Sequence, residues 1–179
     1  ASCRFRHLLE QRRLGEKIFQ IVNEYLAAVG IRVQNGTIVE ATIIQASTSR
    51  KNKQGQPDPE MGVTKKGNPW YYGMKVHVDV DSQTKLIPSM QVPRANVHDS
   101  QALGQLLYGQ EEEVHGDNAS VGQEATIQQK ASKARSCILQ RASRGHPLSA
   151  WQEKWNRWQN AIRAKVDHVF GTFFEIAPE

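Results

Sequence analysis

The chain has too few cysteines and too few long apolar runs for several classes of protein. Two cysteines among 179 residues cannot build a disulfide framework or a cysteine-rich zinc module. No apolar run approaches the roughly 20 residues that a membrane-spanning helix needs. The first residues also lack the apolar centre of a secretory signal. We therefore expect a cytoplasmic protein with no membrane partner.

The composition favours a folded domain with a mild positive charge. Hydrophobic residues make up 39% of the chain, and a chain of this length buries roughly 70% of its unfolded surface on folding. Lys and Arg total 23 and Asp and Glu total 18, so the formal net charge is +5. Such an excess favours a polyanionic partner without identifying it.

The hydrophobic pattern changes its period along the chain. The first thirty residues show helical spacing, and β-branched residues then predict a strand at 37–44 that is apolar on both faces. Further strands are predicted at 71–80, 86–92, 113–117 and 136–140, and further helices at 98–107, 123–134 and 151–173. We predict an α/β domain of residues 35–179, with a mixed sheet covered by helices on both faces, after a helical segment of residues 1–34.

A basic loop interrupts this pattern at about residues 46–69. The segment has almost nothing to bury, and a loop of this length inside a compact domain is usually functional or disordered. Its cations are Arg50, Lys51, Lys53, Lys65 and Lys66. These charges either keep the loop exposed to water or bind a polyanion.

Three carboxylates are candidates for chemistry, and each has an ordinary alternative. Glu40 stands in the middle of the apolar strand, where it needs a compensating cation, and spacing alone favours a structural ion pair. Asp117 ends a predicted strand, where ligands often gather, but it could equally cap the next helix. Asp167 lies four residues after Arg163, so spacing alone predicts a surface ion pair. If the three carboxylates converge, their hard oxygens suit two Mg²⁺ or Mn²⁺ ions.

Several segments resemble the DDE transposases of bacterial insertion sequences, in the order in which that family has them. Residues 36–44 resemble the first catalytic strand. The similar segments that follow are 58–61, 64–77, 95–100, 116–117 and 163–171. The likeness runs from about residue 5 to residue 171, which is nearly the whole chain.

The resemblance implies a ribonuclease H-like (retroviral integrase-like) fold and metal-dependent cleavage and joining of double-stranded DNA at transposon ends. Glu40, Asp117 and Asp167 then occupy the three metal-ligand positions, and Arg163 matches an arginine expected near the scissile phosphate. The expected cofactors are two Mg²⁺ or Mn²⁺ ions, and the partners are transposon-end and target DNA. The residues that the resemblance leads us to expect in contact with DNA are Arg50, Lys51, Lys53, Lys65, Lys66 and Lys75. We also expect the protein to associate with the nucleoid. The resemblance leaves open whether it forms a homodimer.

The chain departs from the family at two of the acids. The first is normally Asp and the third normally Glu, whereas this chain has Glu40 and Asp167. The chain also starts and stops close to the core of the family, as expected of a truncated core. The alternative function is therefore a catalytically impaired module for DNA binding or oligomerisation on the same fold. A nuclease without end specificity is a third interpretation.

Aromatic and histidine residues offer no stronger alternative. Trp151, Trp155 and Trp158 share one helical stripe, and we predict that they pack in the core rather than stack on bases. The histidines, including His115, lack the spacing of a zinc peptidase and are interpreted as surface or hydrogen-bonding residues.

Overall fold

The computed structural model describes residues 8–9, 11–31, 36–46, 58–117 and 120–176. It divides into two units, Ala1–Val33 and Gln34–Glu179. The first unit contains α2 (Leu14–Ala28), which buries none of its side chains, so its apolar residues Ile21 and Tyr25 are exposed. Among the described residues, no helix combines the length and the apolar character that crossing a membrane requires.

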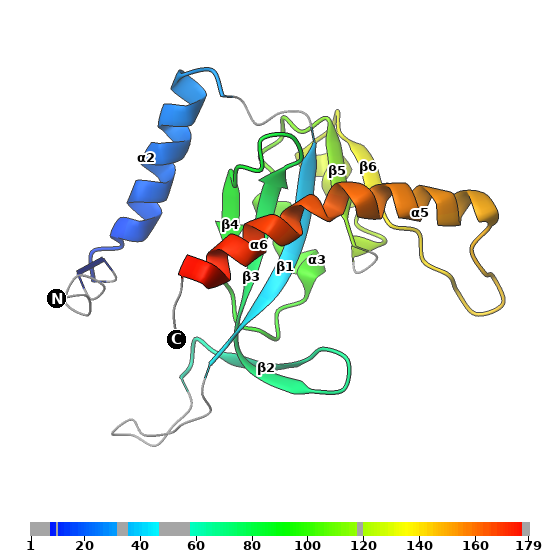
Figure 1. The fold of residues 1–179 in the computed structure, drawn as a ribbon, viewed down its shortest axis with the longest axis horizontal. Coiled ribbons are helices and arrows are strands. Elements are labelled where there is room, and N and C mark those ends of the chain that lie inside the picture. The colour runs from blue at the N-terminus through cyan, green and yellow to red at the C-terminus, as the bar shows by residue number, and fades with distance from the viewer. Residues whose placement is uncertain (1–7, 10, 32–35, 47–57, 118–119, 177–179) are drawn as a thin grey trace. The chain divides into compact units, whose positions relative to one another are not determined.

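The second unit is built on one mixed sheet, to which six strands of the described residues belong (Figure 1). These are β1 (Thr37–Gln45), β2 (Gly62–Lys65), β3 (Trp70–Asp81), β4 (Ser89–Gln91), β5 (Glu113–Gly116) and β6 (Arg135–Ile138). The strand order is β2-β3-β1-β5-β6, and β4 also pairs with β3. The pairs of β3 with β1, β2 and β4 are antiparallel, whereas β1–β5 and β5–β6 are parallel. This topology is consistent with the ribonuclease H-like fold that the resemblance implies.

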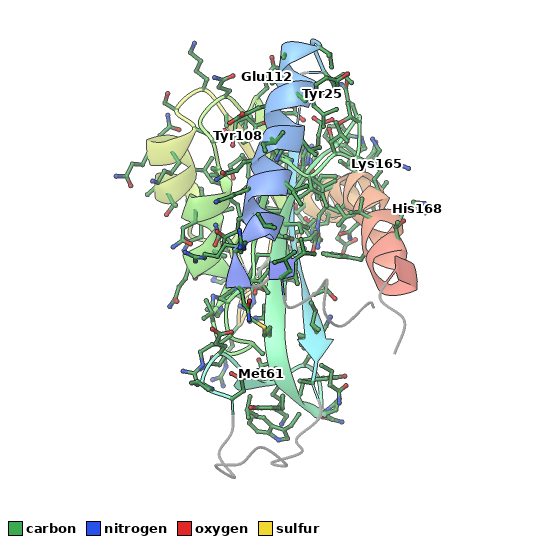
Figure 2. All side chains as sticks on the ribbon, turned by 90° about the vertical axis from the view of Figure 1, so that its left-hand side faces the viewer. Tyr25, Met61, Tyr108, Glu112, Lys165 and His168 are labelled. Carbon is green, nitrogen blue, oxygen red and sulfur yellow. The ribbon has the colours of Figure 1, made fainter. Side chains whose placement is uncertain are left out.

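Helices cover both faces of the sheet, as the sequence predicts. On one face, α3 (Asp99–Leu106) and α4 (Glu124–Lys130) pack over a core that includes Val39, Leu103 and Ile127. On the other face, α5 (Ala150–Arg163) and α6 (Lys165–Ile176) cover a core that includes Ile38 and Val166. Figure 2 shows α6, with Lys165 and His168, on one side of the sheet. Successive residues of β1 therefore point toward different helix layers.

The pairing of β1 with β3 depends on a glycine. Gly73 has φ +154° and lies opposite Gln45, and a Cβ atom there would stand 2.1 Å from the carbonyl oxygen of Ile44. Only a residue without a side chain lets the two backbones approach this closely. The long β1–β3 ladder fixes the register of β1 and therefore the face on which Glu40 lies.

The structure corrects the loop predicted at residues 46–69. Gly62–Lys65 forms β2, which pairs with residues 70–73 of β3. The four residues form a strand by backbone pairing with β3, and they carry too little apolar alternation to be recognised from the sequence. The rest of the prediction falls partly on residues 47–57, which lie outside the described residues.

The predicted helix at 151–173 is also corrected. It divides into α5 and α6, because the amide of Asp167 donates to the carbonyl of Ala164 in a tighter turn. The prediction that the tryptophans pack in the core is wrong for Trp151 and Trp158, which are 67% and 51% exposed. Figure 1 shows the N-terminal half of α5 reaching past β6, the last strand of the sheet. None of the strands in the described part of the chain lies beneath this half of the helix to cover its apolar stripe.

Candidate active site

Glu40 lies on the face of β1 that α5 and α6 cover. Its Oε1 atom accepts a hydrogen bond at 2.5 Å from Nε of Arg163 on α5, and one terminal nitrogen of the same guanidinium also lies 2.5 Å away. The two side chains are only 19% and 15% exposed, so solvent screens their ion pair weakly. The cation that the sequence requires near Glu40 is therefore Arg163.

Burial outweighs this cation in its effect on Glu40. Removal from solvent raises the pKa of Glu40, and the charge and hydrogen bonds of Arg163 lower it by less. The charges of Asp117 and Asp167 raise the pKa of Glu40 further. Both acids are thus close enough to Glu40 to act on it electrostatically.

Asp117 reaches the same place from the neighbouring strand. Val39 of β1 lies opposite Gly116 of β5 in a parallel pair, so Glu40 and Asp117 are the next residues along the two strands. Asp117 Oδ1 lies 3.8 Å from Arg163 Nη1, and its side chain is about half exposed. The parallel register therefore brings the first two predicted acids together at the carboxyl end of β5.

Asp167 lies in the first turn of α6 and lines the same pocket as Glu40 and Arg163. The helical spacing predicts an ion pair between Asp167 and Arg163, but the ion pairs that Arg163 makes are with Glu40 and Asp117. Arg163 is turned toward the sheet, where its charge compensates the more deeply buried carboxylate.

A pocket of about 440 Å³ opens beside these groups. Its lining consists of Glu40, Ala41, Thr42, Lys66, Asn160, Arg163, Ala164, Asp167 and Phe170. Asn160 accepts a hydrogen bond from Arg163 at 3.1 Å and so helps to hold the guanidinium over the acids. The pocket thus joins residues from β1, α5 and α6 with one cation, Lys66, from the basic segment.

The donor set fits a hard divalent cation, but the acids are gathered around Arg163 instead. Carboxylate oxygens are ligands that Mg²⁺ and Mn²⁺ prefer. Among the described residues, one group of three potential metal ligands has its ligand atoms within 4.8 Å of one another, and it consists of Glu113, His115 and Cys137. The three acids of the candidate site are less tightly grouped. To share an ion, the three acids would have to move toward one another, and Glu40 and Asp117 would have to move away from Arg163.

The other predicted DNA contacts differ in their surroundings. Lys66 lines the pocket, and Lys65 is exposed and lies 5.7 Å from the ring centroid of Trp70. Lys75 donates to Asp99 and to the carbonyl of Val97, each at 3.0 Å, and is largely buried, which favours a packing role. The predictions for Arg50, Lys51 and Lys53 fall outside the described residues.

The fold and the site define an α/β protein with a cluster of carboxylates and basic groups at the carboxyl end of a central strand. Residues 32–166 match the family described as "Transposase DDE domain", which is well over half of the chain, and the chain belongs to this family. The match confirms the predicted resemblance, and it ends one residue before Asp167. No solved structure matches the chain. DDE transposases act on DNA and generally use divalent metal ions, so this membership implies a DNA substrate.

Proposed function

We propose that the chain is the ribonuclease H-like core of an insertion-sequence transposase, which cleaves and joins DNA strands at transposon ends. The observation that carries this proposal is the convergence of three acids from separate elements: Glu40 and Asp117 pair with Arg163, and Asp167 lines the pocket of Glu40 and Arg163. Converging acids are costly for the fold, and such costs are typical of functional sites.

The three carboxylates would hold the divalent cations. Two Mg²⁺ or Mn²⁺ ions supply charge that stabilises the attacking and the leaving oxygen of an in-line phosphoryl transfer. Glu40 contributes the most buried oxygens, and Asp117 and Asp167 contribute more exposed ones. Asp167 suits the third metal-ligand position although the family normally has Glu there, because Asp167 already lines the pocket of Glu40.

Arg163 has two roles in this proposal. In the free protein it neutralises Glu40 and Asp117, and near DNA its planar guanidinium can donate paired hydrogen bonds to a phosphate. A phosphate that attracts Arg163 frees the carboxylates for cations. Lys66, on the pocket wall, adds attraction for the DNA backbone.

One observation favours the alternative, a DNA-binding module that does not cleave. Two nitrogens of Arg163 lie only 2.5 Å from Oε1 of Glu40, so the cation is held tightly against an acid that metal binding requires. If this pair does not open, duplex binding persists in EDTA and weakens steeply with added salt, while no strand is cut.

The test uses a supercoiled plasmid that carries the DNA flanking the coding sequence, in Mn²⁺. We expect the wild type to nick it at the flanking junctions, Asp117→Asn to abolish nicking and Glu112→Gln, an exposed control, to leave it unchanged. Cleavage spread over an unrelated plasmid would support a nuclease without end specificity. Duplex binding in EDTA without any cleavage would support the non-catalytic module.

The exchanged acids are tested in the same assay. The double variant Glu40→Asp/Asp167→Glu restores the acids that the family normally has. Since a misplacement of about 1 Å can cost on the order of 100-fold in rate, we expect nicking to increase if the exchanges limit activity. Unchanged nicking would place the limitation elsewhere.

A further inference from the structure

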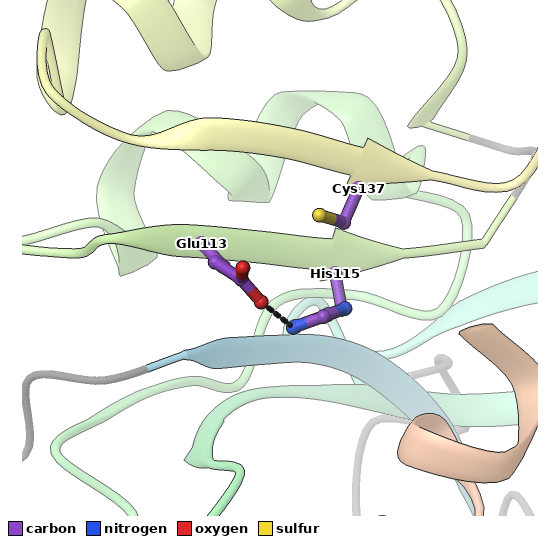
Figure 3. A group of neighbouring side chains, drawn as sticks. All are labelled: Glu113, His115 and Cys137. Atoms are coloured by element: carbon purple, nitrogen blue, oxygen red, sulfur yellow. Dashed lines mark ion pairs between the residues drawn. The ribbon is translucent and has the colours of Figure 1, made fainter. Parts of the chain in front are cut away.

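A second cluster of ligand-type side chains lies on β5 and β6. Glu113 and His115 are two residues apart on β5 and therefore point to the same face of the sheet. Cys137 lies opposite His115 in the parallel pairing of β5 with β6. Figure 3 shows Glu113 and His115 directed toward each other on β5, with Cys137 beside them on the neighbouring strand β6. The sequence separates Cys137 from the others by more than twenty residues, so only the register reveals the cluster.

The distances in the cluster are close to those of a metal site. His115 Nε2 lies 3.3 Å from Glu113 Oε2, and one ligand atom of each of the three residues lies within 4.8 Å of the other two. Two ligands bound to zinc at about 2.05 Å in tetrahedral geometry are about 3.3 Å apart, and a sulfur and a nitrogen are about 3.5 Å apart. The nitrogen and the oxygen already have this spacing, and the sulfur needs to come closer by at most about 1.3 Å.

Neighbouring groups fix the orientation of two of these ligands. His115 Nδ1 lies 2.6 Å from the amide oxygen of Gln159 on α5; because that oxygen only accepts, Nδ1 carries the hydrogen and Nε2 is left to bind. Arg135 pairs with Oε1 of Glu113, while Oε2 faces His115. Such contacts are typical of the groups that orient metal ligands.

A buried amide lies beside the thiol. Gln159 is fully buried, and its side chain, whose oxygen accepts from His115, also interacts with Cys137. His115 and Cys137 are buried as well, at 1% and 0% exposure. A carboxylate, an imidazole nitrogen and a thiol that converge beneath a helix are stable together when a cation or a proton lies between them.

We propose that Glu113, His115 and Cys137 form a Zn²⁺ site, distinct from the acid pocket of Glu40. Nitrogen and sulfur ligands favour Zn²⁺ over Mg²⁺, which prefers oxygen. Binding replaces the thiol proton, which is released to solvent, and His115 binds as neutral imidazole. The ion links β6 to β5 two residues before Asp117, and so stiffens the strand end that carries this acid.

Zinc binding is measured on the metal-free full chain by competition with a chromophoric chelator. We expect one tight equivalent for the wild type, loss of it in Cys137→Ser and at least about 10-fold weaker binding in Glu113→Gln. Cys3→Ser and Glu112→Gln are matched controls that should bind like the wild type. Glu40→Gln/Asp167→Asn should also retain the equivalent, which separates this site from the proposed catalytic one. Co²⁺ in place of Zn²⁺ should give a thiolate charge-transfer band that Cys137→Ser lacks.

Several results would overturn the site. The wild type binding no Zn²⁺ is one, and full binding by Cys137→Ser is another. A loss as large in Cys3→Ser, or in Glu40→Gln/Asp167→Asn, would assign the metal to other residues. If Cys137→Ser does not fold, Glu113→Gln decides, because its partly exposed position tolerates an amide of the same size; unchanged affinity in this variant rejects the proposal.

Discussion

The ion pair between Glu40 and Arg163 allows a quantitative test of how the acid site is held. Replacing Arg163 by Gln leaves a carboxylate that is 81% buried without its cation. Breaking a buried pair by removing one partner costs about 3–5 kcal/mol in the free energy of unfolding. Because some solvent reaches both side chains, we expect about 3 kcal/mol for Arg163→Gln at pH 7.5.

The reverse replacement should cost much less. In Glu40→Gln, Arg163 keeps Asp117 at 3.8 Å and Asn160 as partners, so we expect a loss of about 1 kcal/mol. The double variant has two neutral amides and should also lose only about 1 kcal/mol. The double-mutant cycle therefore predicts a coupling free energy of about 3 kcal/mol.

The effect of Arg163→Gln also depends on pH, with a definite sign. The pKa of Glu40 is raised in the folded state, so protonation of Glu40 favours the folded state. Ionisation therefore costs no folding stability below the unfolded pKa of about 4.3. The loss of stability grows as the pH rises through the folded pKa. Without Arg163 this pKa rises further. The destabilisation by Arg163→Gln should thus be small near pH 4.5 and complete at pH 7.5.

Urea unfolding of the four proteins at both pH values, followed by circular dichroism, measures these differences. Glu40→Gln serves as the reference, since it removes the titrating group and keeps the size of the side chain. Strictly additive losses, or a loss for Arg163→Gln that does not change with pH, would refute the assignment of Arg163 as the cation that compensates Glu40.

Three further predictions concern the rest of the fold. Burial, and then Glu111 and Asp81, raise the pKa of Asp79 well above its usual range while Thr37 lowers it, so ionisation of Asp79 should lower stability as the pH rises from 4. Asp79→Asn should weaken this trend and be more stable at pH 8 by on the order of 1–3 kcal/mol in urea unfolding. Gly73→Ala should lose at least about 2 kcal/mol in the same assay, because its Cβ would meet a carbonyl oxygen; a neutral effect would contradict the close β1–β3 approach. Trp151→Ala should lower the unfolding free energy by less than about 1.5 kcal/mol, the size of its stacking on Trp155, and a loss of 3–5 kcal/mol would show a covered site instead.

The sequence predicts the layers of the fold well and their edges poorly. β-branched runs and helical spacing identify the central strands and the covering helices, since burial imposes those periods. The four residues of β2 carry no such period, and their pairing depends on β3. No proline or glycine near Ala164 indicates that the helix breaks there. The break between α5 and α6 is seen only in the structure, in the backbone hydrogen bond from Asp167 to Ala164.

The site shows the same division between local and distant information. Spacing on the helix connects Arg163 with Asp167, but the structure connects Arg163 with Glu40, 123 residues away in sequence. A local pattern cannot weigh a buried carboxylate on another element against an exposed one nearby. Likewise, helical period places Trp151 and Trp158 on one stripe without telling whether the sheet extends beneath them. His115 could be found only through the β5–β6 register that sets it beside Cys137.

The position of His115 and Asp117 along the chain has a consequence for how metal dependence is interpreted. His115 lies on β5 two residues before Asp117, so a nitrogen donor of the proposed zinc site and an oxygen donor of the acid cluster are close together along the chain. A chelator such as EDTA would strip the proposed structural zinc as well as the proposed catalytic cations, and either loss would lower cleavage. Sensitivity to EDTA therefore cannot by itself assign the metal to the three acids. The two contributions separate only by residue, because Asp117→Asn should abolish cleavage without altering zinc affinity, whereas Glu113→Gln should weaken zinc binding first.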